Sequence, residues 1–180
     1  VRVFQQDTAN EIKKLIDEYQ SLGIKGVLID LRNNPGGLLS SAVEAADLFL
    51  NQGLIVSTKS RSEGDQEFQA LPSQELFNLK LGVLIHGRSA SAAEVFTAAM
   101  KEHQRAVILG ETSYGKGVVQ KLFPIGNGAA LQMTVSHYLT PKGNLIDGQG
   151  IRPNIELPWT LEMKEDVYLN LASEQLLKTK

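Results

Sequence analysis

The stretch GVLIDLRNNPGG, residues 26–37, decides the fold. Its first half is a continuous apolar run, which is typical of a strand buried on both faces. Its second half, RNNPGG, is a dense turn signal, and helical spacing of apolar residues returns over Leu38–Leu50. The same order of strand, turn and helix recurs over residues 81–103, and less clearly after residue 106. This repetition predicts a layered α/β fold with a largely parallel core sheet.

We therefore expect Gly26–Asp30, Leu81–His86 and Ala106–Leu109 to be neighbouring strands of one sheet. Thr8-Ala9-Asn10-Glu11 reads as a capping box that begins a helix ending near Gly23. The remaining expected elements are a strand at 54–58, an exposed polar loop at 59–67, a hairpin from 118 to 140 around Gly126-Asn127-Gly128, an irregular segment from 141 to 158 and a terminal helix at 161–177.

The composition is that of one globular domain: 42% of the 180 residues are hydrophobic and 21% are charged. The net charge is −2 and no basic run stands out, so no nucleic-acid partner is expected. The absence of cysteine excludes disulfides, thiolate metal sites and a cysteine nucleophile. The three histidines lack the spacing of a zinc site. No run is long enough to span a membrane, and a chain that begins at Val1 is expected to be a piece of a longer protein.

In such folds, functional groups lie where a strand ends and the next helix begins, which here means Asn33–Gly37 and Gly87–Ala92. The second segment holds Ser89 and Ser91. A serine hydroxyl at a helix start lies near unpaired backbone N–H groups and the positive end of the helix dipole, a setting that suits stabilisation of an oxyanion. Helix capping alone would also explain either serine.

Residues 110–116 fit the opening of a phosphate-binding loop, G-x-x-x-x-G-K. That loop requires Ser or Thr after the lysine and a helix beyond it. Position 117 is glycine, and the β-branched GVVQKLF that follows is typical of a strand. Since two of three requirements fail, no nucleotide is expected.

A serine nucleophile needs a base, and His86, His103 and His137 all have unconvincing positions. His86 lies on the same segment as the serines, His103 ends the following helix, and His137 lies inside an apolar strand as a structural histidine would. A lysine can act instead where burial favours its neutral amine. Lys116 has glycine and then apolar residues on both sides, which predicts burial, and Gln120 could accept a hydrogen bond from the amine.

Four motifs occur in order: DLRNNPGGLL, GRSASAAEVF, GETSYGKGVVQ and DGQGIRPNIEL. With these motifs the chain resembles the C-terminal processing peptidases, or tail-specific proteases, from Val1 to about Leu157, and it has the family's serine-to-lysine separation. The resemblance implies a serine endopeptidase on a ClpP/crotonase-like layered β-β-α core, with no metal or organic cofactor. By position, Ser91 is then the nucleophile, Lys116 the general base and Gln120 its partner, and the Gly37 and Ala92 N–H groups form the oxyanion hole.

The resemblance also sets expectations for the whole protein. Residues 1–180 would form a protease core with a C-terminal helical extension at 159–180, and the PDZ-like domain that usually precedes it would be absent or truncated. Ala93 and Asn154 depart from the family's usual serine and aspartate. Substrates would be polypeptides with accessible C-terminal tails, in the periplasm, cell envelope or thylakoid lumen. The alternative is a non-catalytic ligand- or peptide-binding core of the same fold.

Overall fold

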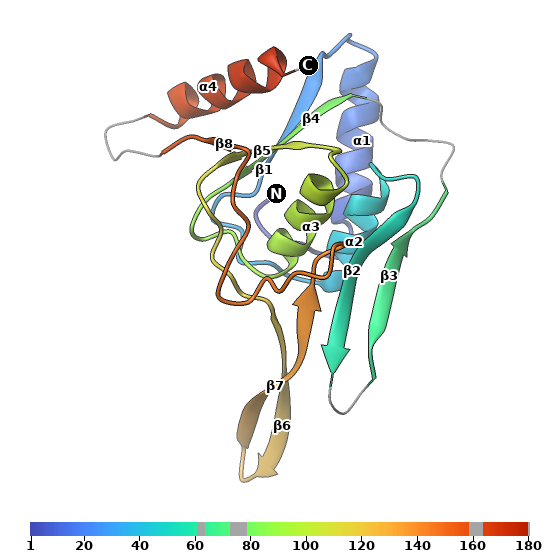
Figure 1. Ribbon diagram of the computed structural model, residues 1–180, viewed down its shortest axis with the longest axis vertical. Helices are drawn as coiled ribbons and strands as arrows, with labels where there is room; N and C mark the ends of the chain where they lie inside the picture. Colours follow the sequence, from blue (N-terminus) through green and yellow to red (C-terminus); the bar gives the residue numbers. More distant parts are fainter. Residues whose placement is uncertain (61–63, 73–78, 159–163, 180) are drawn as a thin grey trace.

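The computed structural model describes residues 1–60, 64–72, 79–158 and 164–179. Within these residues, two four-stranded sheets enclose one group of helices, and a last helix covers the outside of the first sheet (Figure 1). The elements in chain order are α1 (Thr8–Gln20), β1 (Gly26–Asp30), α2 (Leu39–Asp47), β2 (Gly53–Ser60), β3 (Gln66–Ala70), β4 (Lys80–Ile85), α3 (Ala92–Glu102), β5 (Val107–Gly110), β6 (Val118–Gly126), β7 (Ala129–Leu139), β8 (Ile155–Glu156) and α4 (Glu165–Lys178).

The first sheet is parallel and has the strand order β1-β4-β5-β8. The three strands predicted to be neighbours are therefore confirmed as neighbours. The inner strands β4 and β5 are buried along nearly their whole length, whereas β1 lies at the edge of the sheet and is half-buried. The expectation that the 26–31 run is buried on both faces was wrong for this reason.

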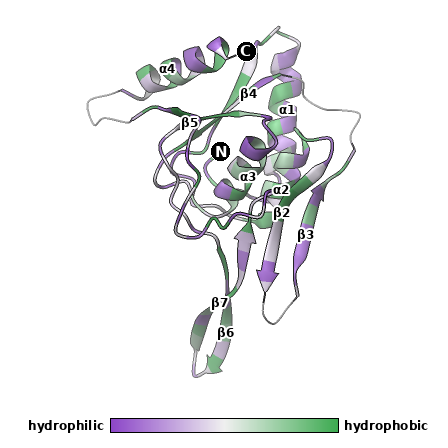
Figure 2. Ribbon diagram, in the orientation of Figure 1, coloured by the Kyte–Doolittle hydropathy of each residue, from purple (hydrophilic) through white to green (hydrophobic). Residues whose placement is uncertain are grey.

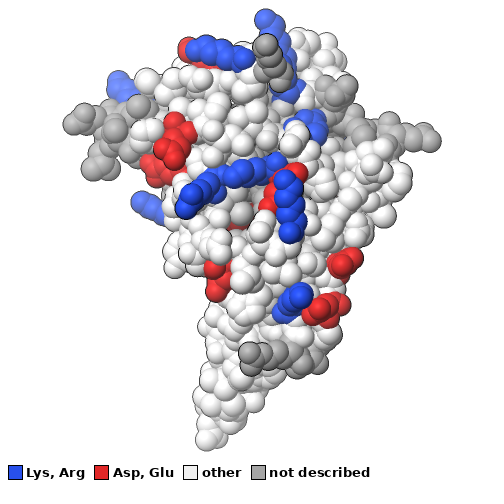
Figure 3. Space-filling model, viewed as in Figure 1, with Lys and Arg blue, Asp and Glu red and all other residues white. Residues whose placement is uncertain are grey.

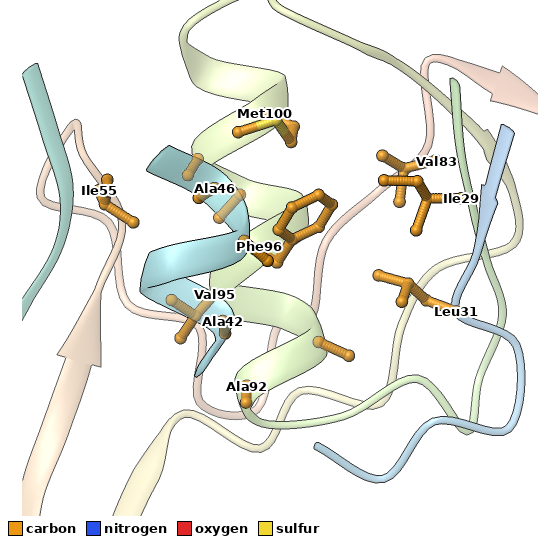
Figure 4. Packing of buried hydrophobic residues seen from close by; sticks show 14 of the residues in the cluster. Ile29, Leu31, Ala42, Ala46, Ile55, Val83, Ala92, Val95, Phe96 and Met100 are labelled. Atoms are coloured by element: carbon orange, nitrogen blue, oxygen red, sulfur yellow. The ribbon is translucent and has the colours of Figure 1, made fainter. Parts of the chain in front are cut away.

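Helix α3 fills the space between the two sheets. Its Phe96 packs against Phe4 and Phe49, with ring centroids 5.9 and 6.4 Å apart. Figure 4 shows Phe96 directed toward Ile29 and Leu31, at and just beyond the end of β1, while α2 lies alongside α3. The buried alanines of α2 and α3 allow the two helices to approach closely. The core thus fixes where α3 begins, which is where the predicted nucleophile lies.

Helix α4 covers the other face of the parallel sheet. Its Tyr168 and Ala172 join a separate buried cluster with Leu84, Leu109 and Leu157. The Arg32 guanidinium lies over the Tyr168 ring, 5.0 Å from the ring centroid. A terminal helix was predicted over 161–177; α4 begins at Glu165, and residues 161–163 lie outside the described part of the chain. No helix of the described chain is both long and apolar enough to cross a membrane.

The second sheet is antiparallel, with the order β3-β2-β7-β6. The polar loop expected at 59–67 was wrong at both ends, because β2 continues to Ser60 and β3 begins at Gln66; residues 61–63 lie outside the described chain. The third strand-turn-helix unit was also wrong: after β5 the chain enters the predicted β6–β7 hairpin and forms no helix there. Asn127 and Gly128 have φ of 50° and 75°, which matches a type I′ turn.

The capping box predicted at Thr8–Glu11 is not formed. Asp7 is the N-cap of α1, and Thr8 is the first helical residue. The Thr8 hydroxyl accepts the Gln5 amide at 2.8 Å instead. Thr8 therefore fixes the turn that leads into α1 without capping the helix itself.

Candidate active site

Ser91 occupies the N-cap of α3, as predicted, and the helix ends at His103. Its φ of 55° and ψ of −118° lie outside the regions that residues with side chains ordinarily adopt, which costs about 1–3 kcal/mol. The loop after β1 lies against it, since a Cβ at Gly36 would be 2.9 Å from the Ser91 Cβ. Only glycine at position 36 leaves room for Ser91 in this strained, half-buried conformation.

Ser89 has a structural role. Its side chain is fully buried, accepts the His86 amide at 3.0 Å and donates to the Leu31 carbonyl at 2.8 Å. These bonds join the ends of β1 and β4. Because the buried Ser89 hydroxyl already makes two hydrogen bonds to the backbone, Ser91 is the better placed of the two serines to attack a substrate.

Two backbone N–H groups lie close to Ser91. Gly37 forms a parallel bridge with Phe4, in which the Phe4 amide donates to Gly36 and the Leu38 amide donates to Phe4. The Gly37 N–H therefore points away from Phe4. Ala92 is the first residue of α3, and a Cβ at Gly36 would lie 3.1 Å from its amide nitrogen. Among the described residues neither the Gly37 nor the Ala92 N–H donates a hydrogen bond, so both are available for an oxyanion.

Glu94 connects Ser91 to the segment that contains Lys116. Its side chain is fully buried, in the first turn of α3. Oxygen Oε2 accepts the Ser91 amide at 2.9 Å and the Lys116 amide at 2.8 Å. Oxygen Oε1 accepts the Ser113 hydroxyl at 2.5 Å and the Gly115 amide at 2.6 Å. One carboxylate thus holds the backbone of both predicted catalytic residues.

This arrangement brings two distant parts of the chain together. Since the Ser91 and Lys116 amides share one oxygen, their nitrogens cannot be further apart than the sum of those two distances. Glu94 was not among the predicted site residues. The signal was present, because Ser91-Ala92-Ala93-Glu94 has the spacing of a capping box. The half in which Glu94 accepts the Ser91 amide is formed, while the Ser91 hydroxyl makes no cap hydrogen bond.

The side chain of Lys116 is exposed, and the predicted burial was wrong. The loop's backbone faces inward to Glu94, which leaves the side chain on the solvent side. Within the described chain, no hydrogen bond joins the Lys116 amine to the Ser91 hydroxyl or to Gln120. The side-chain oxygen of Gln120 instead accepts a hydrogen bond from the side-chain amide of Gln132 at 2.9 Å. Resting catalytic groups are often looser than in a substrate complex, so the dyad and the role of Gln120 stay predictions.

A second loop supports the Lys116 segment. The Gly117 amide donates to the Asp147 carboxylate at 3.1 Å, the Gly148 amide to the Gly115 carbonyl at 2.9 Å, and the Ile151 amide to the Ser113 hydroxyl at 2.7 Å. A Cβ at Gly117 would lie 2.2 Å from the Asp147 nitrogen. The DGQGI motif therefore acts by close packing against the loop that presents Lys116.

None of the histidines takes a catalytic position in the described structure. His86 accepts the Arg88 amide at Nδ1, 3.1 Å away, and burial is the main cause that lowers its pKa. The His103 ring lies 2.7 Å from the Leu54 carbonyl through Nε2. His137 was expected to be a structural histidine inside the sheet, but its side chain is exposed.

Two open cavities, of about 830 and 420 Å³, lie at the other end of α3 from Ser91. Both are lined by Lys101, Gln104 and Asn154. Neither cavity is lined by Ser91, Lys116, Gly37 or Ala92, so both lie away from the candidate site at the N-terminal end of α3.

Comparison with known proteins shows the family to which this chain is similar. The family model described as peptidase family S41 matches residues 1–157. The chain is 41% identical over 170 residues to a carboxy-terminal-processing protease of Bartonella bacilliformis, covering 92% of this chain and 39% of the relative. It is 37% identical over 161 residues to a probable CtpA-like serine protease of Staphylococcus epidermidis, covering 87% of this chain and 32% of the relative. The chain thus spans about a third of the length of these two relatives.

Among solved structures, the chain superimposes on a photosystem II D1 C-terminal processing protease with a TM-score of 0.83 and 27% identity, covering 98% of this chain and 46% of that one. A lipoprotein from Streptococcus agalactiae shares the fold, with a TM-score of 0.67 at 17% identity. The predicted layered α/β fold of the ClpP/crotonase type is confirmed by the architecture and by these neighbours.

Proposed function

Because the chain belongs to peptidase family S41, we propose that it is the core of a serine endopeptidase that works through a Ser91/Lys116 dyad. The observation that carries the proposal is the Glu94 carboxylate, one oxygen of which accepts both the Ser91 and the Lys116 amides. A buried carboxylate with four donors is a stringent arrangement, since each donor must be placed to satisfy it. Helix capping alone would need the Ser91 amide but not the Lys116 amide.

The proposed reaction uses the groups near the start of α3. The neutral Lys116 amine takes the proton of the Ser91 hydroxyl as Oγ attacks a peptide carbonyl carbon. The tetrahedral oxyanion accepts hydrogen bonds from the Gly37 and Ala92 N–H groups. Lysine then gives the proton to the departing amine nitrogen, the C–N bond breaks, and water hydrolyses the acyl-enzyme ester to regenerate Ser91.

The exposure of Lys116 gives substrate binding a part in this scheme. In the structure the lysine side chain faces solvent, where the charged form is well hydrated. A polypeptide lying over Ser91 would cover the amine, and removing water from an amine favours its neutral form. The base would therefore become competent when the substrate is in place.

For the whole protein we propose polypeptide substrates with accessible C-terminal tails, capture of those tails with the help of a PDZ-like domain of the same full-length chain, and a location outside the cytoplasm. The substrate proposal rests on similarity to two proteins whose names describe processing at a carboxy terminus, and the PDZ-like domain and the location are carried over from the family resemblance. Because the reaction needs only side chains and backbone N–H groups, neither a nucleotide nor a metal is part of it.

The test is Ser91→Ala in the full-length protein, with cleavage of an unstructured polypeptide as the readout. We expect the variant to lose turnover. It should also lose the covalent labelling by a fluorophosphonate that the wild-type protein shows. The melting temperature should change by no more than a lost helix cap allows, about 1 kcal/mol of unfolding free energy. Wild-type turnover by this variant would refute Ser91 as the nucleophile and favour the non-catalytic binding core.

A further inference from the structure

The outer edge of β6 begins beside the candidate site. β6 is the last strand of its sheet, and no other strand of the described chain pairs with its outer edge. It starts at Val118, after Lys116 and Gly117. A chain that paired with this edge would therefore have one end at the loop that presents Lys116.

The direction of the backbone groups along β6 can be read from its first contact. The Gly117 carbonyl accepts the Tyr138 amide at 2.7 Å, so Gly117 faces β7. The register shift between Val119 and Gln120 skips Val135 on β7, so the alternation of backbone groups along β6 is kept. It turns the groups of Val118, Gln120 and Leu122 to the open edge. Pro124 falls on the same alternation, as expected for a proline tolerated where its nitrogen faces solvent. The open ladder thus runs from Val118 to Leu122 and ends at Pro124.

One face of the hairpin carries large apolar side chains with little covering them. Phe123 lies opposite Leu131, and Met133 lies opposite Lys121 on the same face. Phe123, Leu131 and Met133 are 42%, 49% and 48% exposed. Figure 1 shows the hairpin reaching away from the body of the molecule, and Figure 2 shows apolar stretches along it.

The charge of the hairpin narrows what could bind there. Between Val118 and Leu139 the sequence has one formally charged residue, Lys121, and no Asp or Glu. Figure 3 shows no acidic or basic side chain over the hairpin tip in that view. A long apolar edge strand is a liability for a soluble protein unless something pairs with it. The edge therefore suits an uncharged, extended chain rather than a folded, charged surface.

We propose that an extended, uncharged segment of the polypeptide substrate adds to β6 as a further strand over Val118–Leu122. Backbone hydrogen bonds to the open edge would provide affinity without demanding a sequence, and the apolar face around Phe123 would favour apolar side chains at alternate positions of the bound segment. The proposal rests on the proposed function, because it takes the bound chain to be the substrate. The continuity of β6 with Lys116 favours this occupant over a second copy of the protein.

The test uses binding, which is independent of the chemistry. In the full-length Ser91→Ala protein, a fluorescent uncharged peptide of about ten residues, longer than a typical strand, is titrated by anisotropy. Leu122→Pro removes one outward N–H and leaves the ladder to β7 intact; Leu122→Ala is the matched control, which keeps the N–H and loses the side chain. We expect Leu122→Pro to raise Kd about fivefold beyond the effect of Leu122→Ala, the effect of one backbone hydrogen bond.

A second measurement needs no substitution in β6. Hydrogen exchange by NMR on the same Ser91→Ala protein should show the Val118, Gln120 and Leu122 amides becoming protected when the peptide binds. The Lys121 and Phe123 amides should be protected beforehand, because they face β7. Peptide binding without this alternating protection would overturn the proposal, and so would equal Kd values for the two Leu122 variants. Protection of the same amides without peptide, in a protein that sediments as a dimer, would assign the edge to a second copy instead. Cleavage by the Ser91-containing protein decides the proposed function separately.

Discussion

Glu94→Gln is the sharpest test of how the site is held together. All four partners of the Glu94 carboxylate are donors: the Ser91, Gly115 and Lys116 amides and the Ser113 hydroxyl. A glutamine of nearly the same shape replaces one acceptor oxygen with an NH₂ group, which would face two of these donors. Hydrogen bonds to charged groups contribute about 1.5–3 kcal/mol each, so losing two should destabilise the fold by about 3–6 kcal/mol.

For a chain of this size, at about 2–4 °C per kcal/mol, the loss corresponds to a fall in Tm of roughly 6–24 °C. The loss of kcat/KM should be larger than the loss of stability alone would cause. The Lys116 backbone would lose its fixed distance to Ser91, and a displacement of about 1 Å at a reacting group can cost about 10²-fold in rate. The assay measures kcat/KM on an unstructured polypeptide well below the Tm of the variant, with circular dichroism to confirm that it is folded.

The matched control is Leu176→Ala, since Leu176 is 3% exposed on α4, on the face of the sheet away from Ser91. Burial of a leucine contributes about 2–5 kcal/mol, which matches the loss expected at Glu94. Ser113→Ala gives a milder change of the same network, because it removes one donor and leaves the three amides. If Glu94→Gln lowered Tm as Leu176→Ala does but kept wild-type kcat/KM, Glu94 would be only a core residue, and our account of the site would be refuted.

Other consequences can be measured on the same protein. Lys116→Met should abolish cleavage with no loss of Tm, because the side chain is exposed, and Lys116→Arg should be equally inactive because a guanidinium stays charged; an active Lys116→Met enzyme would exclude the lysine as base. Ser89→Ala should keep Ser91 chemistry but lower Tm by the equivalent of about 1–3 kcal/mol, since it leaves the part-buried His86 amide without its hydrogen bond, while the Leu31 carbonyl keeps only the Asn34 amide. The His86 pKa is lowered in the fold, chiefly by burial. The unfolded chain therefore binds the proton more readily, and stability should fall as pH drops through the unfolded value near 6.5. His86→Gln should flatten that part of a Tm-against-pH curve, and an unchanged slope would contradict the assignment.

The sequence predicts the parallel sheet well because each of its three main strands is a short apolar run bounded by turn residues. It also predicts the hairpin, since the Asn127-Gly128 turn requires two positive φ angles. β3 was missed because QEFQA is mostly polar, as an exposed edge strand can be. Its pairing with β2 comes from tertiary context that no local pattern contains.

The candidate site was predicted unevenly for a similar reason. The position of Ser91 follows from a buried strand that runs into a helix, which is a local pattern. The capping-box spacing was recognised at Thr8–Glu11, where none forms, and overlooked at Ser91–Glu94, where the glutamate accepts the N-cap amide. The burial of Lys116 was inferred from its apolar neighbours in sequence, but a loop can turn its backbone inward and its side chain outward.

The position of Glu94 also bears on when the enzyme could first become active. Residues 91–94 and 113–116 are held together by the buried Glu94 carboxylate, so their approach depends on the packing of α3 in the core. A nascent or partly melted chain has the serine and the lysine but no fixed distance between them. Under the proposed function, proteolytic competence would then appear only with complete folding of the core, and a copy that is still folding could not cleave the chains around it.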